Sequence, residues 1–390
     1  MISRFLVGEK RGRCGIVLGL YQARTRLGVL PSSSSLFSSS SSRCCGVSSL
    51  GAMNAAQHIR ILDGGTGEEL FSKNWRVPDD RMIWSAIAVK EERYHEALKQ
   101  VHLSFLKAGS MYVTCNNFGI TPGVGFSEDS IKELNQIAGR IARDAVSTFA
   151  DVYGVEREVL GSLPPLVESY RPDKVMGHDE GRRVYKECIV DVMDEYVDGW
   201  LAETLSSSDE VIMALHAIHD SYYQKKEEEQ TGGKTTKPVY VSMCVKRGGC
   251  VRSGETASEA SAKILEKARA WGIQLCGILF NCSRPEDVTL ALRDMGSIRG
   301  MMDDMGVALG AYPNRLTEIS DTWELASNPE PQAMRQDLDE EAFVQLCMEW
   351  VEQYHVTILG GCCGIGPEYI ERLSSRCSRN KMPTTHDHDS

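Results

Sequence analysis

Three cysteines in two distant segments are the residues of this chain best suited to chemistry. Cys362 and Cys363 are adjacent within a glycine-flanked run, and Cys282 directly follows Asn281 farther upstream. Adjacent cysteines cannot form an ordinary disulfide with each other without severe strain. They can, however, face one soft metal ion together with a third thiolate. Three sulfur ligands leave the fourth tetrahedral position of Zn²⁺ open, as in catalytic zinc sites. The alternative is that all three are inert, buried cysteines.

Short β-like runs alternate with longer helical segments from residue 59 onward, and these elements must position the cysteines. We predict strands at 60–62, 111–114, 159–161, 200–202, 239–243, 277–280, 307–311 and 356–359. Helical periodicity marks 91–108, 131–149, 256–271, 286–295, 340–354 and 367–377. Eight strands with helices between them indicate a single-domain α/β fold, a (β/α)8 TIM-type barrel. An open doubly wound sheet is the alternative.

Polar residues stand where the predicted strands end. In a (β/α)8 barrel, the loops at the C-terminal ends of the strands carry the chemistry. Asp63 and Gly64 follow the first predicted strand, and Glu203 ends the fourth. The sixth strand leads into Asn281 and Cys282, and the eighth into Cys362-Cys363. The sequence therefore predicts one site in which two carboxylates and three thiolates share the same end of the barrel.

Composition narrows the possible partners. The chain has 390 residues, of which 42% are hydrophobic, and a formal net charge of −11. This charge predicts no global attraction to nucleic acid or to an anionic membrane surface. We find no run of eighteen apolar residues, so no transmembrane helix is predicted. The 13 cysteines show no disulfide-framework spacing, which favours a reducing compartment or a metal site over secretion.

The two ends of the chain differ in composition from its centre. Residues 1–55 are rich in arginine and serine and contain a single acidic residue, Glu9. This composition is typical of a transit peptide for a mitochondrion or a plastid. The alternative is a cytoplasmic protein whose translation begins near Met53. We predict that residues 56–378 form the barrel and that residues 379–390 are a polar tail.

Several short motifs occur in a fixed order between residues 59 and 377. They are Leu62-Asp63-Gly64-Gly65, Ile83-Trp84-Ser85-Ala86, Val101-His102, Ala108-Gly109, Ala202-Glu203-Thr204, Asn281-Cys282 and Gly360-Gly361-Cys362-Cys363-Gly364. In order and spacing they resemble the homocysteine S-methyltransferase family. That family shares its barrel with betaine–homocysteine methyltransferase and with the homocysteine module of methionine synthase. The element around Cys362-Cys363 is the most specific of these motifs.

The resemblance implies a role for each candidate residue. It implies one Zn²⁺ per chain, held by Cys282, Cys362 and Cys363, with the sulfur of homocysteine as the fourth ligand. Asp63 and Glu203 are then expected to hold the amino group of the substrate by charge-assisted hydrogen bonds. Gly64 lets the backbone approach the substrate closely, and Asn281 either bonds to the substrate or shapes the strand end. Because zinc deprotonates a coordinated thiol, no catalytic residue beyond the zinc-bound thiolate is expected.

The methyl donor is the least determined part of this hypothesis. The expected partners are homocysteine and a small methyl donor, and the oligomeric state is not predicted. A sulfonium donor, S-methylmethionine or S-adenosylmethionine, suits a barrel of this size because its methyl group is already activated for displacement. The product would be methionine. Another donor such as betaine is one alternative, and a zinc or redox barrel without methyl transfer is another.

Four further residues stand at predicted strand ends. Cys115 and Cys244 lie there without matching a ligand motif, so we expect them to be small pocket or core residues. Asn116 and Tyr312 are candidates for the wall of the donor pocket.

Overall fold

Eight parallel strands form the inner layer of the molecule, in the order β1-β8-β7-β6-β5-β4-β3-β2. A backbone hydrogen bond of 2.7 Å from Met111 N to Ile61 O joins the two ends of this order. The computed structural model describes residues 59–72, 75, 77, 83–223, 236–324 and 332–379. The strands are β1 (Arg60–Ile61), β2 (Tyr112–Thr114), β3 (Glu158–Leu163), β4 (Gly199–Leu205), β5 (Val239–Met243), β6 (Leu275–Asn281), β7 (Ala308–Tyr312) and β8 (Ile358–Leu359). This confirms the predicted (β/α)8 barrel and excludes the open sheet.

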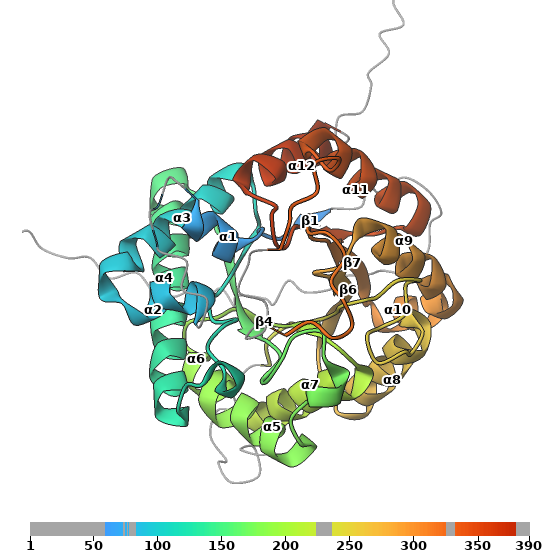
Figure 1. Cartoon of the computed structure of the whole chain (residues 1–390), viewed down its shortest axis with the longest axis horizontal. Coiled ribbons are helices and arrows are strands. Elements are labelled where there is room, and N and C mark those ends of the chain that lie inside the picture. Colours follow the sequence, from blue (N-terminus) through green and yellow to red (C-terminus); the bar gives the residue numbers. More distant parts are fainter. Residues whose placement is uncertain are drawn as a thin grey trace, which may run out of the picture. The chain divides into compact units, whose positions relative to one another are not determined.

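Helices surround the strands as an outer ring (Figure 1). They are α1 (Thr66–Phe71), α2 (Ile87–Lys90), α3 (His95–Ala108), α4 (Glu128–Tyr153), α5 (His178–Tyr185), α6 (Asp191–Met193), α7 (Ser208–Tyr223), α8 (Ala257–Ala270), α9 (Pro285–Asp294), α10 (Arg299–Met305), α11 (Glu340–Tyr354) and α12 (Pro367–Arg379). A π-helical turn, Lys186–Val190, joins α5 to α6. Proline opens both α9 and α12, where its missing N–H costs nothing.

Two hydrophobic layers hold the strands in place. One lies inside the barrel and is built from inward-facing strand residues, among them Leu160, Leu201, Leu279 and Ile358. The other lies between strands and helices and contains most of the buried apolar side chains. Because both faces of the central strands are covered, every residue of β5 and β6 is buried. This double packing fixes the strand ends on which the site is built.

Local signals explain where several helices begin and end. The Thr256 hydroxyl accepts from the backbone N–H of Glu259, and the Glu259 carboxylate accepts from the backbone N–H of Thr256. This pair of bonds makes a capping box at the start of α8. Asp339 caps α11 in a similar way through the N–H of Ala342. Gly109 ends α3 with a φ of 108°, a conformation that glycine adopts without strain. Each of these three helices lies at a position that the sequence predicted.

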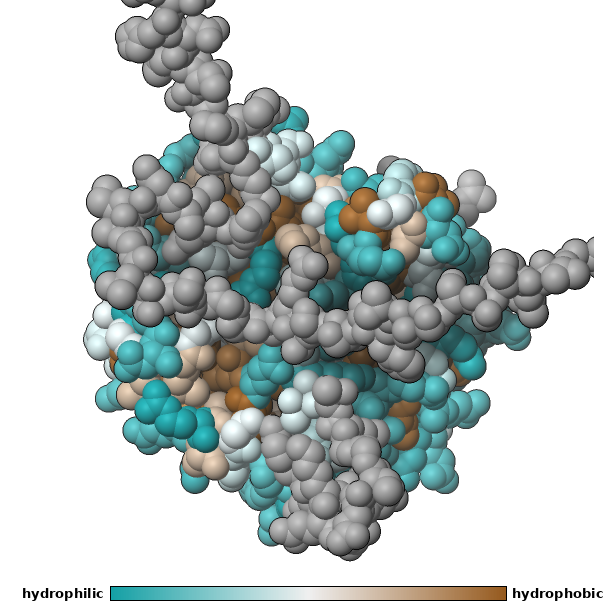
Figure 2. Space-filling model, turned by 180° about the vertical axis from the view of Figure 1, so that it is seen from behind, coloured by the Kyte–Doolittle hydropathy of each residue, from teal (hydrophilic) through white to brown (hydrophobic). Residues whose placement is uncertain are grey.

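The face shown in Figure 2 is mainly hydrophilic, with its apolar residues in small separate groups. Exposed large apolar side chains among the described residues are Met111, Val152, Tyr153, Val155 and Leu290. Within the described part of the chain, no helix has both the length and the apolar character needed to cross a bilayer. The predicted leader and the tail beyond Arg379 lie outside the described residues.

Candidate metal centre and substrate cavity

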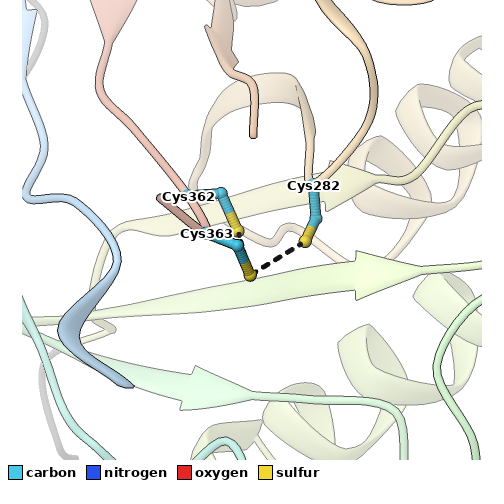
Figure 3. Close-up of side chains that lie close together, drawn as sticks. All are labelled: Cys282, Cys362 and Cys363. Atoms are coloured by element: carbon cyan, nitrogen blue, oxygen red, sulfur yellow. Dashed lines mark hydrogen bonds between the residues drawn. The ribbon is translucent and has the colours of Figure 1, made fainter. Parts of the chain in front are cut away.

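The sulfur atoms of Cys282, Cys362 and Cys363 meet at the C-terminal end of the barrel. Cys282 is the first residue after β6, and the other two lie in the loop after β8. Their side chains point toward one another (Figure 3). The Sγ of Cys363 lies 3.7 Å from that of Cys282 and 4.0 Å from that of Cys362. Among the described residues, these three form the group of ligating side chains suited to a metal ion.

The spacing of the three sulfurs fits a tetrahedral zinc ion. Zn–S bonds of about 2.3 Å at tetrahedral angles place neighbouring sulfurs about 3.8 Å apart. The two measured separations lie on either side of this value. Hydrogen bonds from Cys362 and Cys363 hold the pKa of Cys282 well below its usual range, while the same contacts raise the pKa values of their own thiols. The donor set is therefore a soft, three-sulfur set.

The loop that carries Cys362 and Cys363 is packed too closely to admit a side chain at Gly361. A Cβ there would lie 2.1 Å from Cγ2 of Ile365. At Gly64, a Cβ would lie 2.2 Å from the carbonyl oxygen of the same isoleucine. A backbone hydrogen bond from Cys362 N to Pro313 O (2.9 Å) ties this loop to the end of β7. The glycines thus serve close backbone packing around the cysteines.

A cavity of about 290 Å³ opens directly onto the three sulfurs. Loops that follow six of the strands line it, and they bring together carboxylates, aromatic rings and the cysteines. Gly64 and Glu203 are among the lining residues, as are Cys115 and Asn116. No lysine or arginine occurs among the described residues that line it. The cavity is therefore acidic and largely apolar.

Asp63 and Glu203 are enclosed carboxyl groups at this end of the barrel. Burial raises the pKa of Asp63 to about 7, although its oxygens accept from the backbone N–H (2.7 Å) and hydroxyl (2.9 Å) of Thr114. Burial, and then the neighbouring charges of Asp63 and Cys282, raise the pKa of Glu203 to about 8. The hydroxyl of Ser162 donates to Glu203. Among the described residues no basic side chain forms an ion pair with either carboxyl, and an ammonium group would supply a positive partner.

Left-handed backbone conformations gather around this cavity. Among the described non-glycine residues with positive φ, Trp84 (45°), Tyr170 (67°), Thr204 (60°) and Cys282 (45°) all line it. This conformation costs a bulky or β-branched residue energy, so the surrounding structure must hold it in place. Thr204 and Cys282 each stand next to a predicted site residue. The remaining one, His355 (55°), ends α11. Four such residues around one cavity are typical of a functional site.

Asn281 lies beneath the cavity wall rather than in it. Its side chain is fully buried, and its amide oxygen accepts from Thr204 N (3.1 Å) and Ser242 Oγ (2.8 Å). Its amide nitrogen donates to Thr204 Oγ1 at 2.8 Å. These bonds use the amide to join the ends of β4, β5 and β6. Direct substrate contact by Asn281 stays a prediction, and the observed role is bracing.

Tyr170 is a site residue that no motif or strand-end position in the sequence identifies. It lies in the loop between β3 and α5, is 6% exposed, and its hydroxyl is 2.9 Å from Cys282 Sγ. Burial and the nearby thiol groups raise its pKa well above the usual value, so the hydroxyl keeps its proton and donates. Ser162 and Thr114 were also missed as partners of the carboxylates. Their position at strand ends was the signal that could have identified them.

The other strand-end residues divide between cavity and core. Cys115 and Asn116 line the cavity, and Asn116 donates to Ser85 O at 2.9 Å. Cys244 is fully buried, and its thiol lies 3.4 Å from Leu205 O. Tyr312 is buried among the inward-facing residues inside the barrel.

Comparison with known proteins gives both distant sequence relatives and a shared fold. Methionine synthases from Mycobacterium leprae (strain TN) and Mycobacterium tuberculosis (strain ATCC 25618 / H37Rv) are each 22% identical over 338 residues, 84% of this chain and 25% of the relative. The chain thus spans about a quarter of the length of these relatives. The metallated homocysteine methyltransferase MmuM from Escherichia coli has a TM-score of 0.60 at 19% identity, covering 82% of this chain and 96% of that one. Its apo form has a TM-score of 0.57 at 18% identity, with the same coverage. These two structures share the fold of this chain.

The model of one protein family matches nearly the whole described barrel. The family is described as homocysteine S-methyltransferase, and the match covers residues 60–377. This range includes both enclosed carboxyl groups and all three clustered cysteines. The chain belongs to the homocysteine S-methyltransferase family.

Proposed function

We propose that this protein transfers a methyl group from a sulfonium donor to the sulfur of homocysteine and so forms methionine. The observation that carries the proposal is the placement of three clustered sulfurs and two enclosed carboxyl groups at one end of the barrel. Family membership supports homocysteine as the methyl acceptor. The donors proposed are S-methylmethionine and S-adenosylmethionine.

The acceptor end of the site follows from the carboxyl groups. Asp63 and Glu203 are proposed to bind the ammonium group of homocysteine, which would let both carboxyls ionise. Thr114 and Ser162 hold these carboxyls by hydrogen bonds, so the ammonium meets a fixed partner. With its ammonium group fixed in this way, homocysteine would direct its thiol toward the three cysteines. Positioning of this kind lowers the barrier by removing the search for a reactive geometry.

The metal end follows from the donor set. Cys282, Cys362 and Cys363 are proposed to hold one Zn²⁺, since their sulfur separations suit it. When bound, zinc would supply the means of deprotonating the homocysteine thiol at neutral pH. The chain then needs no general base. Glu203 is not proposed as a general base despite its elevated pKa, because its proposed partner is the ammonium group of the substrate.

The charge of the cavity favours a cationic donor. The carboxyl side chains of Glu68 and Glu168 line it, and no described lining residue is basic. A sulfonium amino acid carries one net positive charge at neutral pH, whereas betaine carries none and a reduced folate is negative. Opposite charges in a partly enclosed site attract more strongly than in water. The sulfonium donors therefore suit this cavity best.

Aromatic rings in the same cavity add to this preference. Trp84 and Phe118 meet edge to face with ring centroids 6.1 Å apart, and Tyr170 and Trp323 do so at 5.5 Å. All four rings line the cavity. Ring faces attract cations, including alkylated onium groups. A quaternary ammonium would gain from these rings as well, so the carboxylates rather than the rings separate a sulfonium donor from betaine.

A donor panel tests the proposal. Zinc-loaded protein is assayed with homocysteine and, separately, S-methylmethionine, S-adenosylmethionine, betaine or 5-methyltetrahydrofolate, while zinc content is measured. We expect about one zinc per chain and methionine from the sulfonium donors. Methionine from betaine alone would replace the donor assignment. Zinc without methyl transfer from any donor would favour the structural or redox barrel.

A further inference from the structure

Tyr170 is hydrogen-bonded to the sulfur of Cys282, one of the three proposed metal ligands, and is held there from several sides. Its hydroxyl lies 2.9 Å from Cys282 Sγ. The edge of Trp323 packs on its ring, with centroids 5.5 Å apart and planes at 82°. Next to it, Arg171 forms an ion pair of 2.5 Å with Glu324, which neighbours Trp323. The loops after β3 and β7 are thus joined at two adjacent positions, and the left-handed φ of Tyr170 is fixed between them.

Arg252 places a buried positive charge on the ring of Tyr170. Its guanidinium carbon lies 5.0 Å from the ring centroid, and its side chain is 4% exposed. The same guanidinium donates to Ile319 O (3.2 Å) and to Asp321 Oδ1 (3.1 Å). A cation this deeply buried needs compensating negative charge nearby. The exposed carboxylate of Asp321 supplies part of it.

The three cysteine sulfurs are not equivalent in their contacts. Cys282 Sγ accepts from the Tyr170 hydroxyl and has Asn314 Nδ2 at 3.9 Å. For Cys362 and Cys363, the described hydrogen bonds of the sulfur are with the other cysteines of the cluster. Hydrogen bonds to a ligating group change how much charge it gives to its metal. Cys282 is therefore the cluster sulfur whose charge the surrounding protein adjusts.

We propose that the Tyr170 hydroxyl, positioned by Arg252, withdraws charge from the Cys282 sulfur and thereby strengthens the binding of the homocysteine thiolate. The inference rests on the zinc centre of the proposed function. With less charge donated by Cys282, a bound zinc ion would be a stronger Lewis acid for the fourth sulfur. Tyr170 would then govern affinity for the acceptor rather than the rate of methyl transfer, and Arg252 is a positioning residue that acts through it.

Tyr170→Phe is the direct test, because it keeps the ring, its contact with Trp323 and the guanidinium above it. Cobalt(II) replaces zinc, and the sulfur-to-cobalt charge-transfer band is recorded. We expect the band to move to lower energy, since a thiolate without its hydrogen bond gives up charge more easily. In the zinc enzyme, KM for homocysteine should rise about tenfold, while kcat should not fall.

Tyr112→Phe is the matched control. Tyr112 is also buried, and its hydroxyl lies 3.3 Å from that of Tyr240 inside the barrel, at the start of β2. Removing this hydroxyl should leave the cobalt band and KM unchanged. If Tyr170→Phe also leaves both unchanged, Tyr170 is a packing residue and the inference is overturned. Wild-type protein that binds neither zinc nor cobalt would instead overturn the proposed function on which the inference rests.

Arg252 is tested through its dependence on Tyr170. Arg252→Lys keeps the charge and should shift the cobalt band less than Tyr170→Phe does. Combining the two substitutions should shift the band no farther than Tyr170→Phe alone, because residues in one array are not additive. Additive shifts would show that Arg252 acts on the cluster independently and would remove its positioning role.

Discussion

Thr204 and Asn281 exchange two hydrogen bonds across the end of the barrel, from Thr204 N to Asn281 Oδ1 (3.1 Å) and from Asn281 Nδ2 to Thr204 Oγ1 (2.8 Å). Each stands beside a site residue, since Glu203 precedes Thr204 and Cys282 follows Asn281. The pair therefore links the carboxyl groups of the site to the proposed metal ligands. A substrate that spans both ends depends on the separation that this pair maintains.

Replacing Asn281 with alanine should damage acceptor binding more than metal binding. Thr204 and Ser242 would lose their buried amide partner, which costs about 1–3 kcal/mol of stability. We expect KM for homocysteine to rise while zinc content stays near that of the wild type. Tyr222→Phe is the control, because Tyr222 is buried and its hydroxyl accepts from Trp200 Nε1 (2.9 Å) at the start of β4, away from the cavity. It should lose stability without a change in this KM.

Replacing Cys362 with alanine should remove most of the zinc and the activity with it. Two remaining sulfurs make a poor site for an ion that prefers four ligands. Metal analysis of the purified variant checks this. Cys244→Ala is the control, since its buried thiol contacts the carbonyl oxygens of Thr204 and Leu205 and lies outside the proposed ligand set. Zinc retained in the Cys362 variant would exclude that residue from the site.

The sequence predicted the barrel because its eight strands are short apolar runs separated by polar or glycine-rich loops. The helix predicted at 340–354 agrees with the observed α11, Glu340–Tyr354, whose apolar face repeats at helical spacing. By contrast, α7 was missed. Its residues Val211, Ala214, Leu215, Ala217 and Ile218 are all buried, so it lacks the clear polar face by which the others were recognised. The helices α5 and α6 were also not predicted. The π-helical turn between them breaks the regular spacing of apolar residues by which helices are recognised.

The site was predictable only where its residues stand at strand ends. Cys282, Cys362 and Cys363 were selected in this way, and the structure brings their sulfurs together. Tyr170 was not selected, because it lies in a loop without periodicity and contacts a sulfur 112 residues away in the chain. The bracing of Thr204 by Asn281 depends on how neighbouring strands are staggered. No local pattern of residues contains that information.

The elevated pKa of Glu203 predicts how stability changes with pH. In the homocysteine-free protein this carboxyl titrates near 8 rather than at its usual 4.5. Between these values the folded state binds more protons than the unfolded state, so stability falls as pH rises. Relative to Glu203→Gln, the wild-type free energy of unfolding should fall by up to about 1.4 kcal/mol per pH unit in this range. Urea unfolding at a series of pH values measures it.

Two controls accompany the pH measurement. Glu133 is an exposed carboxyl on α4, and its Gln variant should follow the wild-type profile. Saturating homocysteine should flatten the difference between the wild type and Glu203→Gln above pH 6, because the bound ammonium permits ionisation. A wild-type slope that matches Glu203→Gln throughout would show that this carboxyl titrates as it does in water.

The first residues are predicted to serve targeting rather than catalysis. A chain that begins at Met53 should retain zinc content and activity, because the first barrel strand starts at Arg60. Loss of soluble protein on this truncation would contradict the prediction. A fluorescent fusion of residues 1–55 tests localisation, and we expect it to enter a mitochondrion or a plastid. Diffuse cytosolic fluorescence would favour initiation near Met53.

Neutralising Glu68 or Glu168 in the cavity lining should weaken the binding of sulfonium donors selectively. Glu68→Gln and Glu168→Gln each remove one negative charge from the cavity lining. At an effective dielectric constant near 20, such a loss is worth about 1–2 kcal/mol, or roughly a five- to thirtyfold rise in KM for the sulfonium donor. KM for homocysteine should change much less, because Asp63 and Glu203 remain. Glu371→Gln on the exposed face of α12 should change neither value. If both cavity variants keep the wild-type KM for S-methylmethionine and S-adenosylmethionine, charge does not select the donor. The donor assignment would then rest on the aromatic rings alone, which admit betaine equally well.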